Sequence, residues 1–215
     1  MYEVGDRSRA AAGGGAHQQV RQADTRTKAE VPQVWWTSLK ADTHRVHGRW
    51  SLRLLVRSLL TSRTYRVLFT LRLCQARWGV LAAPLHRFTC ASAGMDLPRR
   101  TAIGPGLAIN HGWGLVISAG ARIGKNVTLF HGVTLGRRDR IDRDGARAIG
   151  YPTIEDEVCL GPHAVVLGAV TIGRGSRLAA GALVTESVPA HSVVQGNPAQ
   201  VVRSGCQPDV MNPCS

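Results

Sequence analysis

The sequence has few aromatic residues, no paired cysteine motif and no long apolar run. Phenylalanine, tryptophan and tyrosine make up only 5% of its 215 residues, which argues against a core built from bulky rings. Its five cysteines are an odd number and form no Cys-x-x-Cys pair. This argues against a disulfide framework or a zinc ribbon and favours a reducing, cytoplasmic location. No apolar run approaches the roughly 20 residues of a membrane span, and the N-terminus lacks a signal-peptide core.

Acidic residues are also scarce relative to basic ones. The chain carries 27 Lys and Arg against 14 Asp and Glu, a formal net charge of +13, and 24 of the basic residues are arginine. A surplus of this size suits nucleic acid, an acidic cofactor or a membrane surface. Because no RNP, helix-turn-helix or zinc-finger pattern accompanies it, we expect no nucleic-acid partner.

The composition separates three segments from a central domain, residues 95–202. Residues 1–33 are poor in aliphatic side chains, so we predict a disordered tail, because too little apolar surface is available to offset the ordering entropy. Residues 34–94 carry aliphatics at helical spacing with arginines between them and predict two or three amphipathic helices. We expect these helices to pack on the next domain or a neighbouring subunit, with peripheral contact to an anionic membrane as the alternative. Residues 203–215 form a C-terminal tail.

Within residues 95–202 an aliphatic residue recurs at every sixth position. A fixed period of this kind indicates a solenoid, in which each hexad supplies a short strand and a turn and about 18 residues close one triangular coil. We therefore predict a mainly β fold, a parallel β-helix preceded by a short α-helical region. The hexad positions are Ile103, Ile109, Leu115, Ile123, Leu129, Leu135, Ile154, Leu160, Val166, Ile172, Leu178 and Val184.

Two interruptions break the count. Two extra residues fall between Leu115 and Ile123, and a longer excursion, residues 137–152, leaves one corner of the coil. The excursion contains five arginines and three aspartates and cannot continue an apolar core. Loops of this length in a compact domain are commonly functional.

Two histidines fall on adjacent coils. His111 and His131 each lie two positions after a hexad residue, and subtracting the two-residue insertion turns their 20-residue interval into one coil of 18. Both imidazoles are therefore expected to point outward from the same face, stacked one strand apart, with Pro162 and Ala180 in the same column. An outward histidine is not a core residue, so it is a candidate for chemistry.

The resemblance to a known family rests on three stretches: MDLPRRTAIGPGLAINHGWGLVI (95–117), VTLFHGVTLG (127–136) and VPAHSVVQGNPAQVV (188–202). They resemble the hexapeptide acyltransferases, specifically the serine acetyltransferase family, and are also similar to the colanic-acid-type exopolysaccharide acetyltransferases. The resemblance implies a left-handed coil, a homotrimer, and acetyl-CoA as co-substrate between neighbouring prisms, with no metal. It also implies O-acetylation of L-serine, the reaction that serves cysteine biosynthesis.

The same resemblance assigns the catalytic residues. His111 matches the general base and Asp96, 15 residues earlier, the acid that orients it. A hydroxyl becomes a competent nucleophile when a base takes its proton, and a carboxylate behind the base fixes its tautomer. Backbone N–H groups of Gly112 and Gly114 are candidates to hold the oxyanion. Four positions match residues that bind CoA, with the arginine on the 3′-phosphate: Gly136, Gly161, Arg177 and Ala180.

Three further positions are assigned to acceptor binding, and all depart from the family pattern. Serine acetyltransferases typically carry an aspartate before the base and an Arg-His pair at the end of the excursion, where this chain has Asn110, Gly150 and Tyr151. His131 stands where glutamine is usual, and the exopolysaccharide enzymes often have histidine there. We assign Asn110, His131 and Tyr151 to the acceptor, and a sugar hydroxyl stays open as the alternative to serine.

Two other classes remain as alternatives. The γ-class carbonic anhydrases share the prism but need two histidines five residues apart, which this chain lacks. A non-catalytic scaffold, docked on membranes through the basic helices, is the second alternative. It predicts no CoA affinity and no CoA release with any hydroxyl acceptor.

Overall fold

The computed structural model describes residues 31–76, 79–141, 145 and 147–214. Four helices precede the coil: α1 (Val31–His47), α2 (Leu52–Thr61), α3 (Arg63–Gln75) and α4 (Gly79–Ala93). The predicted tail 1–33 lies outside the described residues except for 31–33, which form the first turn of α1. None of the described helices is long and apolar enough to cross a lipid bilayer.

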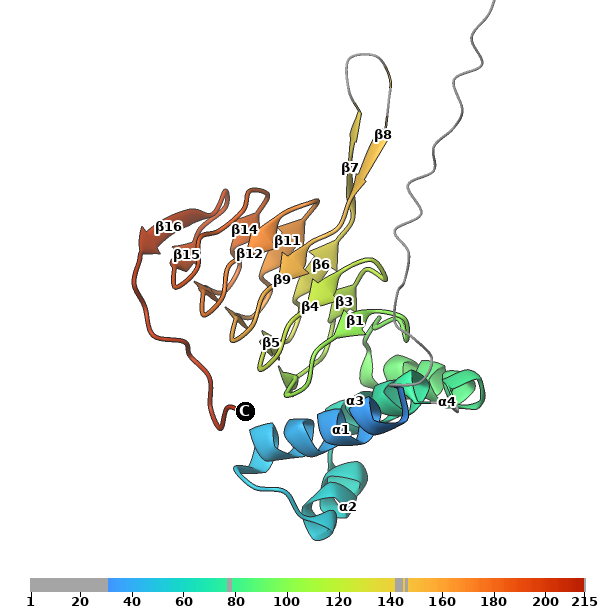
Figure 1. Cartoon of the computed structure of the whole chain (residues 1–215). Coiled ribbons are helices and arrows are strands. Elements are labelled where there is room, and N and C mark those ends of the chain that lie inside the picture. The colour runs from blue at the N-terminus through green and yellow to red at the C-terminus, as the bar shows by residue number, and fades with distance from the viewer. Residues whose placement is uncertain (1–30, 77–78, 142–144, 146, 215) are drawn as a thin grey trace, which may run out of the picture.

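Short strands in three sheets form the body of the molecule (Figure 1). The first sheet contains, in spatial order, β1 (Ala102–Ile103), β4 (Arg122–Ile123), β9 (Thr153–Ile154) and β12 (Thr171–Ile172). The second contains β16 (Gln200–Arg203), β15 (Val193–Gln195), β13 (Arg177–Leu178), β10 (Cys159–Leu160), β5 (Thr128–Phe130) and β2 (Ala108–Asn110). The third contains β14 (Leu183–Val184), β11 (Val165–Leu167), β6 (Thr134–Gly136) and β3 (Val116–Ile117).

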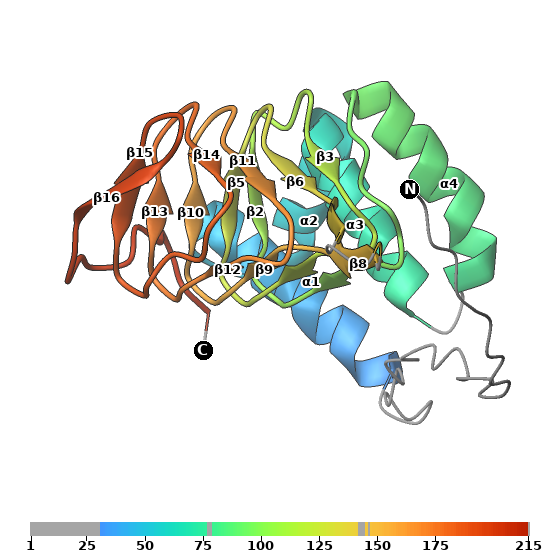
Figure 2. The same ribbon diagram turned by 90° about the horizontal axis from the view of Figure 1, so that it is seen from above.

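Successive strands of the coil, from β1 to β6 and from β9 to β15, belong to different sheets, and the strands within each of the three sheets pair in parallel except at β16. The chain therefore winds as a three-sided parallel β-helix, which Figure 2 shows as a row of stacked coils. The aliphatic hexad residues stack inside it, as at Ile103, Ile123, Ile154 and Ile172, all at most 6% exposed. The predicted mainly β fold after a helical region is confirmed.

The register of the third sheet corrects the position of the two-residue insertion. Ile117, not Leu115, pairs with Leu135 and continues the hexad column. Asn110 pairs with Phe130, and Val116 pairs with Thr134. Five residues therefore lie between Asn110 and Val116, whereas three lie between Phe130 and Thr134. The extra residues therefore lie within the turn 111–115, before the predicted place. Both Leu115 and Ile117 are buried aliphatics, which is why spacing alone did not separate them.

The helices cap the N-terminal end of the coil (Figures 1 and 2). Val67, Leu68 and Leu71 of α3 are buried in the same apolar cluster as the first coil, so the predicted packing of the helices on the next domain is confirmed for α3. Ser51 and Ser62 accept hydrogen bonds from the first-turn N–H groups of α2 and α3, as N-cap residues do. Cys90 and Ala93 of α4 belong to the same cluster, and Arg45 of α1 donates hydrogen bonds to Gly106 and Thr128 of the coil.

A buried ion pair joins α1, α3 and the first coil. Arg72 and Asp42 are both fully buried, with Nε–Oδ2 at 2.8 Å and Nη2–Oδ1 at 3.0 Å. Arg72 also donates to the carbonyls of Ile103 and Gly104, and Asp42 accepts from the N–H of Leu107. The pair is therefore fully hydrogen-bonded across three elements that are distant in sequence, which is the condition for a buried charge to be tolerated.

The two segments outside the regular coil have defined structure. The excursion contains the antiparallel hairpin of β7 (Arg138–Ile141) and β8 (Arg147–Gly150), which projects from the coil (Figure 1). The segment predicted as a C-terminal tail instead returns along the coil toward α1. Asn212 donates to the carbonyl of Arg45 and the N–H of Cys214 donates to Asn126.

Burial of His86 in α4 makes folding stability depend on pH. Its Nε2 lies 2.8 Å from the carbonyl of Leu97 and its Nδ1 lies 3.0 Å from the hydroxyl of Thr70. Burial lowers the pKa of His86, whereas an unfolded histidine titrates near about pH 6.5. The unfolded chain therefore binds the proton more readily, so this contribution is full above about pH 6.5 and is lost as the pH falls.

We expect the melting temperature to fall from about pH 7 to about pH 5, a window above ordinary carboxylate titration. Thermal melts followed by circular dichroism measure it, with His86→Gln as the comparison, because an amide keeps a donor toward Leu97 but does not titrate. The variant should show a flatter profile. Identical profiles for the two proteins would contradict the assignment of the pH dependence to His86.

Candidate active site

Three histidines line one corner of the prism, the turns between the second and third sheets. We call this the histidine corner. The rings of His111 and His131 lie 6.3 Å apart, and those of His131 and His163 lie 5.0 Å apart, both pairs edge to face. His111 and His163 are exposed and His131 is half-buried. The structure thus places the two predicted imidazoles on adjacent rungs and facing out of the core.

The inserted residues shape the corner around His111. Met95 packs where a side chain on Gly112 would lie, and Trp113 packs against Gly94. The indole of Trp113 is 57% exposed. The guanidinium of Arg63 lies over this ring in a cation–π contact, 5.3 Å from the ring centroid. The inserted residues therefore place His111 and the indole of Trp113 outside the regular coil.

His163 was missed by the sequence spacing. It lies three positions after its hexad residue instead of two, and the ring sits over Gly132, where any Cβ would collide with Nδ1 of His163. Gly132, which leaves room for the His163 ring, is the sequence signal for this contact. The Nδ1 atom of His131 is buried and has no hydrogen-bond partner among the described residues, so this corner holds an unsatisfied polar atom.

Asp96 lies beside the corner without touching His111. Its backbone forms a bridge with Val116 and its side chain is exposed. Among the described residues, its carboxylate makes no hydrogen bond with the His111 ring. Of the predicted oxyanion donors, the N–H of Gly114 is already donated to the carbonyl of Gly94 at 2.9 Å, so that assignment is wrong. The N–H of Gly112 has no such partner within the described part of the chain.

The predicted acceptor residues separate into two places. Asn110 ends β2 and is exposed next to His111, so Asn110 and His131 share the histidine corner. The ring of Tyr151 packs over Gly120, at the turn between the third and first sheets where the hairpin leaves. We call this turn the hairpin corner. One chain therefore does not bring Tyr151 together with Asn110 and His131.

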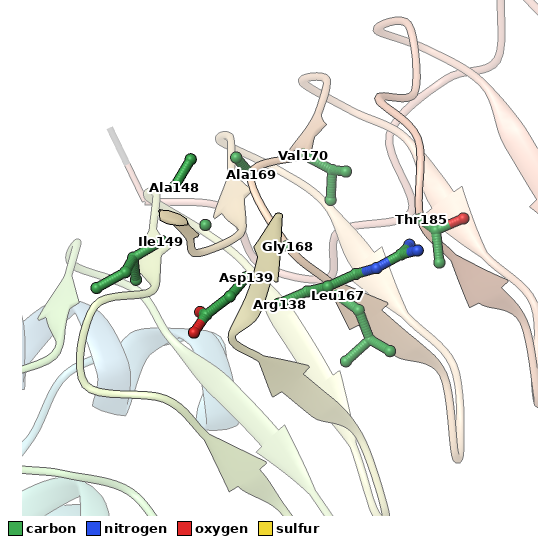
Figure 3. A pocket seen from close by; sticks show the side chains of 10 residues that line it. Arg138, Asp139, Ala148, Ile149, Leu167, Gly168, Ala169, Val170 and Thr185 are labelled. Carbon is green, nitrogen blue, oxygen red and sulfur yellow. The ribbon is translucent and has the colours of Figure 1, made fainter. Parts of the chain in front are cut away.

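A pocket of about 300 Å³ lies at the hairpin corner, lined by residues of the hairpin and the third sheet (Figure 3). Arg138 stands opposite Gly150 in the hairpin register. A Cβ on Gly150 would lie 2.5 Å from the backbone nitrogen of Ala169, so no side chain fits there. In Figure 3 the Arg138 side chain extends past Leu167 toward Thr185. Within the described residues Arg138 has no ion pair.

Three of the four predicted CoA positions line one groove. A groove of about 710 Å³ on the second sheet includes Gly161, Arg177 and Ala180, whereas Gly136 lies on the third sheet against Leu167. A Cβ on Gly161 would lie 2.8 Å from a backbone oxygen of the next coil, so glycine is needed there for close approach. Arg177 forms an exposed ion pair with Asp209 of the returning C-terminal segment at 2.9 Å.

Cys159 also lines this groove but is not a nucleophile. The side chain is 4% exposed, and burial raises the pKa of its thiol to about 11. At neutral pH the thiol is therefore protonated, and the reactive thiolate is scarce.

Comparisons with known proteins decide the family. The bacterial transferase hexapeptide family model (six repeats) matches residues 151–186. The serine acetyltransferase of Helicobacter pylori strain 26695 is 32% identical over 155 residues, covering 72% of this chain and 86% of that protein. The chain belongs to the serine acetyltransferase family.

Other members of the family are longer. The chain matches 45% of serine acetyltransferase 2 of Arabidopsis thaliana at 36% identity and 52% of the Mycobacterium tuberculosis enzyme at 40% identity, so it spans about half the length of these relatives. The matches cover 68% and 57% of this chain. The crystal structure of the Brucella abortus serine acetyltransferase superimposes with a TM-score of 0.66 at 29% identity, covering 80% of this chain and 71% of that one.

Proposed function

We propose that the protein is an acetyl-CoA-dependent O-acetyltransferase, a cytoplasmic enzyme that transfers acetyl from CoA to the hydroxyl of L-serine for cysteine biosynthesis. The observation that carries the proposal is the pair of outward imidazoles, His111 and His131, on adjacent rungs of a chain in the serine acetyltransferase family. No metal takes part in the proposed reaction.

His111 acts as the general base. Its ring nitrogen takes the proton of the acceptor hydroxyl as that oxygen attacks the thioester carbon, and negative charge develops on the carbonyl oxygen. The Gly112 N–H is the remaining backbone candidate to hold that charge. When the carbon–sulfur bond breaks, the imidazolium returns the proton to the departing CoA thiolate, so His111 ends the cycle neutral.

Asp96 is the positioning residue for this base. A carboxylate that accepts from Nδ1–H would fix the tautomer and stabilise the imidazolium, as in a serine-hydrolase triad. Asp96 is exposed beside the corner and makes no hydrogen bond with His111 among the described residues. Catalytic hydrogen bonds often tighten only in the complex with substrate. The dyad closes when the acceptor is bound.

The assembly that we propose is a homotrimer of left-handed coils. The separation of the histidine corner from the hairpin corner supports it, because a neighbouring prism can present its hairpin corner, with Arg138 and Tyr151, to the histidine corner of the first. A site built in this way explains why predicted acceptor residues lie at two corners of one chain. Trimer symmetry then makes three equivalent sites.

The groove beside the histidine corner is the proposed place for acetyl-CoA. Small residues at Gly161 and Ala180 leave room for a pantetheine arm against the coils. Arg177 is placed to meet a phosphate, for which it must exchange its exposed partner Asp209. A solved structure of the Brucella abortus relative in complex with coenzyme A, 29% identical to this chain, supports the choice of co-substrate.

A sugar hydroxyl is the second candidate acceptor. Asn110 in place of the usual aspartate removes a partner for the serine ammonium, and Gly150 removes the usual partner for its carboxylate. A candidate replacement is Arg138, which stands opposite Gly150 and has no ion pair among the described residues. A substitution of Arg138 therefore tests whether the acceptor has a carboxylate.

The experiment that tests the proposal is a thiol-release assay with the full chain and acetyl-CoA. The acceptors are L-serine, homoserine, free sugars and nucleotide sugars, each with mass-spectrometric detection of the O-acetyl product. Serine-dependent CoA release supports the proposal. Release with a sugar alone redirects it to the second candidate, and no release with any hydroxyl acceptor supports the scaffold alternative.

We expect Arg138→Gln to raise KM for L-serine by about 10-fold to 100-fold with a smaller effect on kcat, because it removes a charged hydrogen bond to the carboxylate. Steady-state kinetics with varied serine measure this. The matched control is Arg147→Gln, which removes an exposed hairpin arginine paired with Asp139 and should leave KM unchanged. An unchanged KM in Arg138→Gln would contradict the assignment of this residue to the acceptor.

A further inference from the structure

Helix α2 turns an apolar stripe to solvent. Leu52, Val56 and Leu60, spaced four residues apart on one face, are 64%, 46% and 75% exposed. We call these three residues the α2 stripe. They line an open groove of about 500 Å³ together with Arg53, Arg57 and Thr61. An amphipathic helix in a globular protein ordinarily turns such a stripe to the core, whereas here α2 buries only Leu55 and Ser58.

The sequence around the α2 stripe contains arginines and no acidic residue. From residue 43 to residue 95 the sequence contains no Asp or Glu. Among the described residues, neither Arg53 nor Arg57 forms an ion pair. Both are exposed, and further exposed arginines of the helical region are Arg49, Arg63, Arg66 and Arg87.

Charge decides what kind of surface can cover this face. A second copy of the chain docked face to face would oppose arginine to arginine, and like charges across an interface are costly. A nucleic acid would match the arginines, but it would leave three aliphatic side chains against phosphates. A surface that is anionic at its polar layer and apolar immediately beneath satisfies both features, and this is the chemistry of an anionic lipid bilayer.

We propose that α2 docks the protein on anionic lipid. The helix lies in the plane of the headgroups, the α2 stripe enters the acyl boundary, and Arg53 and Arg57 reach outward to lipid phosphates along their apolar stems. At ten residues, about 15 Å long, it is an interfacial element and not a spanning one. The inference does not depend on the proposed acetyl transfer.

Vesicle co-sedimentation of the full chain tests the proposal. We expect binding to equimolar phosphatidylcholine and phosphatidylglycerol, weak binding to phosphatidylcholine alone, and loss of binding at high salt. Arg53→Gln and Arg57→Gln should each weaken binding about 5-fold, and Leu52→Ser with Leu60→Ser about 10-fold or more. All four positions are exposed, so the variants should keep the wild-type melting temperature.

Matched controls lie away from α2. Val201→Ser removes an exposed valine of β16, and Arg122→Gln removes an exposed arginine of the coil; neither should change lipid binding. Equal binding to both vesicle compositions, or no loss in the α2 variants, overturns the proposal. The proposal is also overturned if the wild-type chain fails to bind vesicles and light scattering shows an oligomer that Leu60→Ser dissociates. The α2 stripe is then covered by a second copy of the chain.

Discussion

We expect the His111→Ala variant to lose about 10²–10⁴-fold in kcat for acetyl transfer, the range that a general base contributes. The side chain is exposed on the turn that holds the inserted residues, so the melting temperature should change little. Thiol-release kinetics with acetyl-CoA and the active acceptor measure the loss, and circular dichroism checks the fold.

The matched control for His111 is His163→Ala. This histidine is also exposed at the histidine corner, and its ring packs on His131 as the ring of His111 does. It has no assigned proton-transfer role, so kcat should change little. If His163→Ala lost turnover while His111→Ala retained it, the general base would be His163 and not His111.

The second large effect concerns stability. We expect Asp42→Asn to lower the free energy of unfolding by about 3–5 kcal/mol, because the change leaves the fully buried guanidinium of Arg72 without its counter-charge. Urea titration followed by tryptophan fluorescence measures it. Trp35 and Trp50 pack on the apolar cluster of α1, α2 and α3 and report on this region.

The control for the buried pair is an exposed one. Arg177 pairs with Asp209 at 2.9 Å, and both side chains are about half exposed. Asp209→Asn should cost about 0–1 kcal/mol, since exposed ion pairs contribute little. Equal losses in the two variants would mean that burial is not what makes the Asp42–Arg72 pair strong.

Much of the fold follows from the period of the sequence. A residue repeated every six positions can only be buried in common if three short strands close a coil, so the mainly β architecture and the excursion at 137–152 were predictable. The exact register was not. Leu115 and Ile117 both satisfy an aliphatic count, and only the pairing of Val116 with Thr134 locates the inserted residues in the turn after Asn110.

The candidate site was predictable in part for the same reason. Coil spacing was sufficient to put His111 and His131 on one corner, because one turn of the coil converts sequence distance into adjacency. Spacing did not find His163, whose ring leans over Gly132. It also placed an oxyanion donor at Gly114, whose N–H the structure uses for a backbone bond to Gly94.

The local repeat of the sequence is enough to predict a coil of short strands and the side of that coil on which two imidazoles stand. The partners of the charged groups depend on contacts that form only when the chain folds. Asp42 pairs with Arg72, and Arg177 pairs with Asp209. Arg138 stands opposite Gly150 and has no ion pair within the described part of the chain. These are contacts between elements brought together by folding, and no repeat encodes them. For that reason the choice of acceptor is tested at Arg138, and docking on a membrane surface is tested at α2.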